Sequence, residues 1–222
     1  MNSRVGIDAQ AVPKTNPTPL RGLSALTQVK LGAFGRRLLD SAGRTLGGPM
    51  TWQNRKLAEA YDLLALAQIA SRFSVEFLDL RESLRAVATL QAPVPCLPDA
   101  GGNLRIAQRA LLGIRYPEEA LRTPLPGFSF VEILEPKGVW HANVSAESVQ
   151  MLCLGAQLPA GIQLKEIVLM TYGALIMATV MIDELDPAGV LNPEAARWWQ
   201  HNIKLVPLSR ASFLDNRKPG EA

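Results

Sequence analysis

The sequence predicts an α+β domain in which helices pack on one face of an antiparallel sheet. Three observations support this fold class: a helical pattern of apolar residues follows Thr51, four segments between residues 73 and 134 alternate apolar and polar side chains, and an uncharged apolar run covers residues 167–182. Strands followed by helices are typical of α+β domains, because the helices can cover one face of the sheet.

The composition is that of a folded protein with one core. The chain has 222 residues, of which 48% are hydrophobic and 19% are charged. This length suits one domain with extensions, and we divide the chain into an N-terminal extension (1–50), a folded domain (51–203) and a C-terminal arm (204–222). The net charge of +3 is too small for the basic field of a typical nucleic-acid-binding protein.

The cysteines and the first residues favour a cytoplasmic protein with reduced thiols. Cys96 and Cys153 could form one bridge, but nothing else resembles the disulfide framework of a secreted protein. The first residues also lack the apolar core of a signal peptide. The apolar run at 167–182 is shorter than the roughly 20 residues of a bilayer span. We therefore expect a buried central helix and no membrane as a partner.

Residues 1–50 differ in character along their length. Three prolines among polar residues at 1–20 predict an unfolded tail. Residues 23–40 have apolar positions at helical spacing, which Gly32 and Gly35 weaken. Two interpretations of this segment stay open, a helix that lies on the domain and an amphipathic segment that binds a partner. Residues 43–49 contain three glycines and suit a linker.

The first helix of the domain is expected to begin after Thr51, a usable N-cap, and to cover residues 52–73. Arg55 and Lys56 lie in its first turns, where the helix macrodipole favours acids. They are interpreted as solvated surface or as part of a docking site for a partner. The expected buried face contains Leu57, Tyr61, Leu64 and Gln68.

Four strands are expected next, at residues 73–80, 83–90, 104–114 and 128–134. Turn residues separate them, which indicates an antiparallel meander. The expected inward positions are Phe73, Val75 and Phe77 in the first strand, Leu84, Ala86, Ala88 and Leu90 in the second, Leu104, Ile106, Ala110, Leu112 and Ile114 in the third, and Phe128, Phe130 and Leu134 in the fourth.

Two helices are expected in the C-terminal half. The central helix begins near residues 158–161 and extends to about Met181, and a loop at 183–190 follows it. Asn192 is a good N-cap for a short last helix that has Pro193 at its first position.

One thiol and two polar side chains form the candidate site. Cys153 is a candidate nucleophile, provided that its thiol is exposed in a loop. The amide of Asn143 can donate to an oxyanion, and His141 can hold the loop by hydrogen bonds to its backbone. The alternative is that Cys153 is a small core residue and His141 is structural.

An ordered set of motifs runs through residues 52–203. It consists of Tyr116-Pro117 at the end of the third strand, Pro124 and Pro126 before the fourth, His141-Ala142-Asn143, Cys153-Leu154, and Leu191-Asn192-Pro193-Glu194 at a helix start. This order resembles the ubiquitin-conjugating enzyme family. That family has His-Pro-Asn where this chain has His141-Ala142-Asn143, and its catalytic Cys-Leu where this chain has Cys153-Leu154. The fold that the resemblance implies has an N-terminal helix, a four-stranded meander, a catalytic loop, a central buried helix and a short C-terminal helix.

The chain looks like a divergent bacterial member of that family. Such members occur beside a ubiquitin-like protein, an activating enzyme and often a metal-dependent deconjugating peptidase, in operons associated with defence against phage. The resemblance implies that Cys153 accepts the ubiquitin-like protein from the activating enzyme as a thioester and passes it to an amine of a target protein, for which lysine is the expected acceptor. Asn143 then stabilises the oxyanion and His141 holds the loop. No metal or organic cofactor is expected.

The resemblance also suggests roles for four charged residues. Asp183 and Asp186 are candidates for the environment of the acceptor lysine, and their alternative interpretation is that of solvated acids after a helix. Arg55 and Lys56 are candidates for docking the activating enzyme on the first helix.

The chain departs from the family pattern in two ways at this site. Ala142 replaces the proline of the tripeptide, and the interval from His141 to Cys153 is longer, so residues 144–151 must bulge. Two rival classes therefore stay open. The first is an inactive conjugating-enzyme-like scaffold, which a buried Cys153 would favour. The second is an unrelated α+β module in which Cys153 belongs to the core.

Overall fold

The structure is a computed structural model that describes residues 51–80, 82–98, 103–179, 183, 189–207 and 212–214. The interpretations of residues 1–50 and of Asp186 lie outside these residues. The elements in chain order are α3 (Trp52–Ile69), β1 (Phe73–Asp79), β2 (Leu84–Leu90), β3 (Val94–Cys96), β4 (Arg105–Ala107), β5 (Ala110–Tyr116), the 3₁₀ turns η1 (Glu118–Leu121) and η2 (Gly127–Ser129), β6 (Val131–Glu135), β7 (Gln150–Met151), α4 (Leu164–Leu175), α5 (Pro193–His201) and the 3₁₀ turn η3 (Ile203–Leu205).

The main sheet is antiparallel and has the strand order β1-β2-β5-β6-β7. The α+β class and the meander of the first four of these strands are confirmed. One expected strand is wrong: residues 104–114 are divided between β4, which pairs with β3 in a separate two-stranded sheet, and β5. The short β7 was not expected. It matters for the site because Cys153 lies two residues beyond its end.

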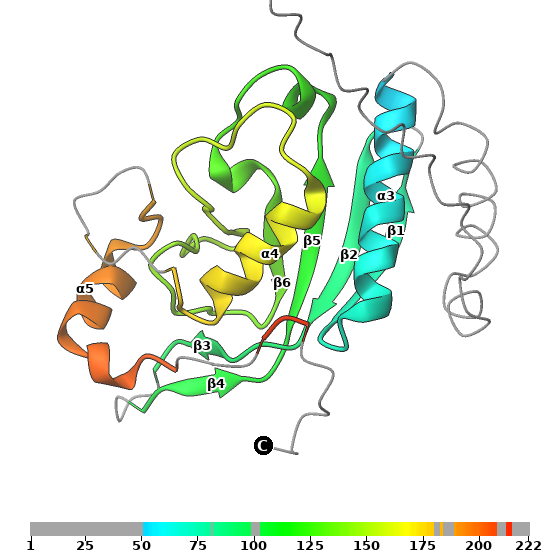
Figure 1. Ribbon diagram of the computed structural model, residues 1–222. Helices are drawn as coiled ribbons and strands as arrows, with labels where there is room; N and C mark the ends of the chain where they lie inside the picture. Colours follow the sequence, from blue (N-terminus) through cyan, green and yellow to red (C-terminus); the bar gives the residue numbers. More distant parts are fainter. Residues whose placement is uncertain are drawn as a thin grey trace, which may run out of the picture.

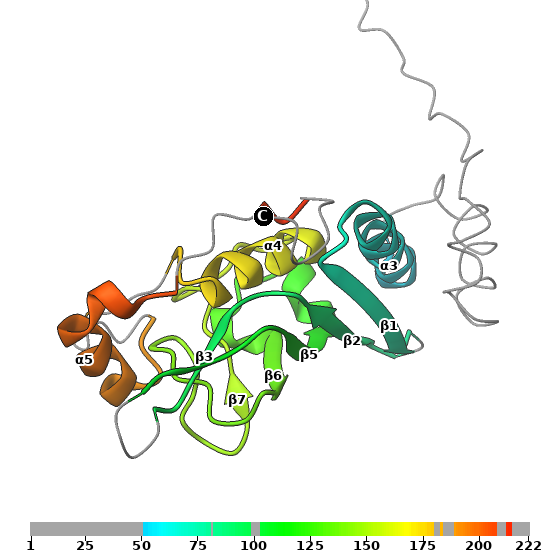
Figure 2. The ribbon, with the colours of Figure 1, turned by 90° about the horizontal axis from the view of Figure 1, so that it is seen from below.

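Helices α3 and α4 lie on one face of the main sheet, and the core fills the space between the layers (Figures 1 and 2). The inward residues of β2 are all buried, as its alternation predicts: Leu84, Ala86, Ala88 and Leu90. In the fourth predicted strand Phe130 is buried as predicted, but Phe128 is 45% exposed, and within β6 it is Val131 and Ile133 that point into the core. The cause is η2, which places a turn where a strand was expected.

The N-terminus of α3 is the predicted one, because the side chain of Thr51 accepts a hydrogen bond from the backbone N–H of Asn54 at 3.2 Å. The buried face of α3 includes Leu57 and Leu64 but also two charged residues, Lys56 and Glu59. Gln68, which was expected on this face, is exposed. The buried face of α3 is therefore rotated relative to the predicted one, and it includes charged side chains that have partners inside the molecule.

The central helix is shorter than the sequence predicts. α4 starts at Leu164 with a capping box formed by Gln163 and Glu166, and it ends at Leu175. Soon after that end, Met177 has a φ of 63°, which no α-helix contains. Leu169 and Met170 are 44% and 37% exposed, so α4 buries one face rather than its whole surface. None of the helices in the described part of the chain is long and apolar enough to cross a membrane.

The last helix begins as predicted, with the Asn192 side chain accepting the N–H of Ala195 at 3.0 Å and Pro193 at the first position. α5 lies beside the β3–β4 hairpin (Figure 1) and forms a small second core there around Trp199. Within the expected arm, Phe213 is only 6% exposed and packs on Tyr172 of α4 and Phe73 of β1. The domain core therefore extends past the expected boundary at residue 203.

Candidate active site

The loop that contains His141 and Asn143 runs beside the segment that leads to Cys153. The backbone N–H of Cys153 donates to the carbonyl oxygen of Asn143 at 2.8 Å, and Val144 forms an antiparallel bridge with Leu152. Ser145 N–H donates to the carbonyl of Met151 at 2.9 Å. The structure thus brings together the cysteine and the asparagine that lie ten positions apart in the sequence.

His141 is fully buried and bonds to backbone on both sides of its ring. Its Nδ1 accepts the N–H of Asn143 at 3.0 Å, and its Nε2 lies 2.9 Å from the carbonyl oxygen of Ala174 in α4. The neutral ring with its proton on Nε2 satisfies both contacts. Burial lowers the pKa of His141 to about 4, partly offset by the hydrogen bond to Ala174. His141 therefore fixes the turn to α4 and is not placed to move a proton at the thiol.

This lowered pKa predicts acid sensitivity. Between pH 6.5 and pH 4 the unfolded chain protonates His141 while the folded chain does not, so the free energy of unfolding should fall by up to about 3 kcal/mol as the pH is lowered. Urea unfolding at pH 7 and pH 4.5 measures this loss. His141→Gln should be less stable at pH 7 and should lose less on acidification than the wild type. Replacement of the exposed His201 by Gln should leave the wild-type dependence, and an equal dependence in H141Q would contradict the assignment.

Asn143 is 5% exposed, and its side-chain amide donates to the carbonyl of Gly189 at 2.7 Å. The same segment is tied to the turn a second time, because the N–H groups of Leu191 and Asn192 both donate to the carbonyl of Ala142 at 2.9 Å. The amide that was expected to serve an oxyanion thus holds the segment before α5. The bond to Gly189 uses one N–H of this amide, so donation to an oxyanion must come from the other N–H or follow the loss of this bond.

Cys153 is 5% exposed, so the expectation of an exposed thiol is wrong. Its Sγ donates to the carbonyl of Gly155 at 3.3 Å, and Gly155 has a φ of 133°, which favours glycine. The turn at Gly127 holds this segment in place: Gly127 N–H donates to the Gly155 carbonyl at 3.1 Å and its own carbonyl accepts the N–H of Leu154 at 3.4 Å. The next two residues, Ala156 and Gln157, are exposed. The thiol thus lies just beneath a surface segment.

Arg55 and Lys56 have partners within the molecule, which contradicts their interpretation as solvated surface. Lys56 is 1% exposed, and its Nζ lies 5.2 Å from the ring centroid of Trp52. The Arg55 Nε is 2.7 Å from a carboxylate oxygen of Glu59, an ion pair without the angle of a hydrogen bond, while its Nη2 donates to the carbonyl of Gly161 at 2.9 Å. Lys56 is not available to a docking partner.

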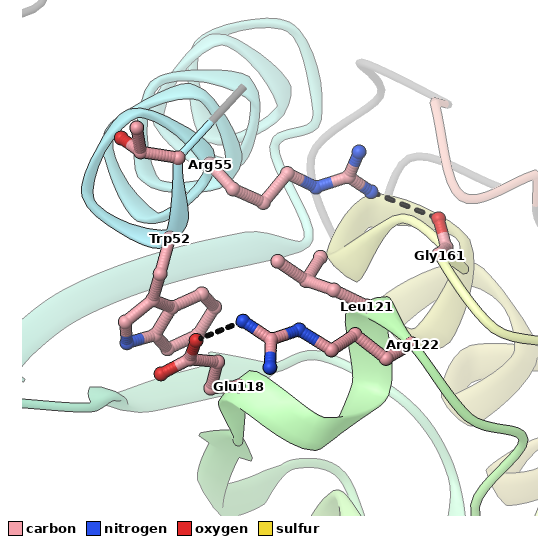
Figure 3. A pocket seen from close by; sticks show the side chains of 7 residues that line it. Trp52, Arg55, Glu118, Leu121, Arg122 and Gly161 are labelled. Atoms are coloured by element: carbon pink, nitrogen blue, oxygen red, sulfur yellow. Dashed lines mark hydrogen bonds and ion pairs between the residues drawn. The ribbon is translucent and has the colours of Figure 1, made fainter. Parts of the chain in front are cut away.

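Arg55 also borders a pocket of about 550 Å³ at the N-terminus of α3 (Figure 3). Opposite it lies Arg122, whose side chain is 77% exposed and pairs with Glu118 at 2.9 Å. Of the two arginines that line the pocket, Arg122 is the more exposed, and the sequence analysis did not single it out. The pocket is lined by Thr51, Trp52, Arg55, Glu118, Leu121, Arg122 and Gly161.

Asp183 is exposed, and Asp186 lies outside the described residues. Both cysteines are free thiols, and Cys96 is completely buried.

No protein-family model, no curated protein and no solved structure matches this chain. Any function must therefore be argued from the residues and their geometry.

Proposed function

We propose that this protein carries a ubiquitin-like protein as a thioester on Cys153. It would accept the acyl group from an activating enzyme and transfer it to an amine, a lysine being the expected acceptor, of a target protein. The observation that carries the proposal is the hydrogen bond from Cys153 N–H to the carbonyl of Asn143, which seats the thiol residue against a turn that His141 holds from inside. Ordered motifs from Tyr116 to Pro193 support the same class.

The chemistry needs only the thiol and the donor molecules. The Cys153 thiolate attacks the carbonyl carbon of the incoming thioester, a new C–S bond forms, and the thiolate of the activating enzyme leaves. The amine then attacks the new thioester, an amide bond forms, and the Cys153 thiolate leaves while the amine proton passes to solvent. Asn143 would donate to the oxyanion in both steps through its side-chain amide, one N–H of which is bonded to Gly189 in the structure.

The remaining parts of the proposal concern partners and setting. The pocket beside α3 suits the activating enzyme, with Arg55 on its wall and the exposed Arg122 at its edge. Exposed Asp183 would lie in the region that the acceptor approaches. Two free thiols suit a reducing cytoplasm. The proposed setting is antiphage defence, with a deconjugating metallopeptidase as a further partner, and its support is the resemblance of the motifs to divergent bacterial members of the family.

A second function is favoured by one specific observation. Cys153 is 5% exposed and its thiol donates to Gly155, as expected of a residue that does not react. In that case the protein is a scaffold that binds the ubiquitin-like protein or its activating enzyme without forming a bond.

Purification of the tagged full chain from its own cells under acidic, non-reducing conditions separates the two functions. The carrier should show a mass increase of one ubiquitin-like protein, and a thiol reductant should remove it. Cys153→Ala should abolish the adduct completely. Cys96→Ala changes the other buried thiol and should retain the adduct. An adduct that survives in C153A would eliminate the assignment, and association without any adduct would establish the scaffold.

A further inference from the structure

Gln150 connects the two backbone segments that meet at the site. It is 3% exposed and uses the full pairing capacity of its amide nitrogen. Its Nε2 donates to the carbonyl oxygens of Ile133 at 3.0 Å and Pro136 at 2.9 Å. Its Oε1 accepts the backbone N–H of Val139 at 2.9 Å. A single side chain thus ties β7 to β6 and to the segment that follows β6.

The positions of these contacts relate them to the thiol. Val139 lies two residues before His141, and Gln150 lies three residues before Cys153. On its other side the segment at Val139 is held by β3, through the bridge between Val139 and Cys96 and through Trp140 N–H, which donates to the carbonyl of Pro95 at 2.8 Å. The segment leading to His141 is therefore fixed from two sides, by β3 and by Gln150. Of these two, Gln150 is the one whose own segment continues to Cys153.

We propose that Gln150 is a positioning residue for Cys153. Its side chain fixes the distance between the segment before Cys153, to which Gln150 belongs, and the segment at Val139, which leads to the His141 turn. The inference rests on the proposed carrier function for its purpose, but its geometry concerns the thiol alone. Residues 145–148 between the two segments are largely exposed and bend out from the domain. The turn itself is held locally by the bond from Asn143 N–H to His141 Nδ1, and the amide of Gln150 adds a constraint on the segment that enters the turn, through Val139.

Loss of this amide should have opposite effects on two reactions of the same thiol. Without the bonds of Gln150, the buried N–H of Val139 has no acceptor and the segment before Cys153 can shift. A thiol that leaves its contact with Gly155 becomes easier to alkylate. The same shift spoils the alignment that acyl transfer needs, for which a misplacement near 1 Å costs on the order of 100-fold in rate.

The test compares Gln150→Ala, Gln150→Met and Gln157→Ala in a Cys96→Ala background, so that Cys153 is the thiol that is observed. Met keeps the volume of the side chain but none of the three bonds, and Gln157 is an exposed glutamine four residues after Cys153. Two quantities are measured on each full chain at a temperature where it is folded: the rate constant of Cys153 with iodoacetamide, and the level of the reducible adduct in its own cells.

We expect both Gln150 variants to alkylate faster than the parent and to lose most of the adduct, while Q157A matches the parent in both quantities. If Q150M behaves as the parent, the bonds are irrelevant and the inference is overturned. If the parent itself forms no adduct, the carrier function fails, and the alkylation rates alone decide: an unchanged rate in Q150A and Q150M overturns the positioning of the thiol, and a raised rate supports it.

Discussion

Replacement of Glu59 by alanine should lower the free energy of unfolding by about 3 to 5 kcal/mol, because it removes a buried carboxylate that pairs with Arg55 within α3 and accepts a hydrogen bond from the start of α4. Glu59 Oε2 accepts the N–H of Leu164, the first residue of α4, at 2.6 Å, and Oε1 lies 2.7 Å from the Arg55 guanidinium. The variant leaves a partly buried cation without its counter-charge and the start of α4 without this acceptor. Urea unfolding at pH 7 measures the loss.

Two variants separate the causes of this loss. Glu59→Gln keeps an acceptor for Leu164 but removes the charge, and burial already raises the pKa of Glu59, so the charge itself is costly there. We therefore expect an intermediate loss. Asp62→Ala, one turn further along α3, breaks a pair with Lys165 of α4 whose side chains are 41% and 43% exposed, and it should cost less than about 1 kcal/mol. A loss in E59A no larger than that in D62A would show that the Glu59 carboxylate does not hold α3 and α4 together.

Local signals predicted the parts of the fold that depend on local structure. Thr51 and Asn192 act as helix caps through hydrogen bonds three residues away, so their roles are visible in the sequence. The alternation of β2 was equally clear. The β3–β4 hairpin was missed because apolar residues alternate on both sides of Gln108 and Arg109, so the break between β4 and β5 leaves no gap in the pattern. The end of α4 was missed because the apolar run continues past Leu175.

At the site, the motifs predicted which segments meet but not how their side chains are used. The pairing of Asn143 with Cys153 followed from motif order, whereas the burial of Cys153 and the bond from Asn143 to Gly189 depend on distant segments. The burial of Lys56 and that of Gln150 were not predicted, for the same reason. Polar residues are expected on the surface, and only tertiary partners show that these two are inside.

Gly127→Ala should have the largest local effect near Cys153. A Cβ at this position would lie 2.2 Å from the carbonyl oxygen of Gly155, 2.6 Å from its nitrogen and 2.9 Å from the nitrogen of Leu154. These atoms are backbone and cannot rotate away, so the η2 turn and the segment after Cys153 must separate. We expect a loss of about 3 kcal/mol in the free energy of unfolding. Because the Cys153 thiol donates to Gly155, its alkylation rate in the folded protein should change as well.

Gly113→Ala tests whether the effect belongs to the site rather than to glycine replacement. At that position in β5 the nearest atoms to an added Cβ are side-chain carbons of Leu134 at 3.5 Å or more, which is an ordinary contact. G113A should therefore stay within about 1 kcal/mol of the wild type and keep its Cys153 alkylation rate. Equal behaviour of the two variants would mean that Gly127 does not clamp the segment, and the thiol would then owe its burial to other contacts. A large effect in G127A alone would place the control of Cys153 in the backbone contact between Gly127 and Gly155.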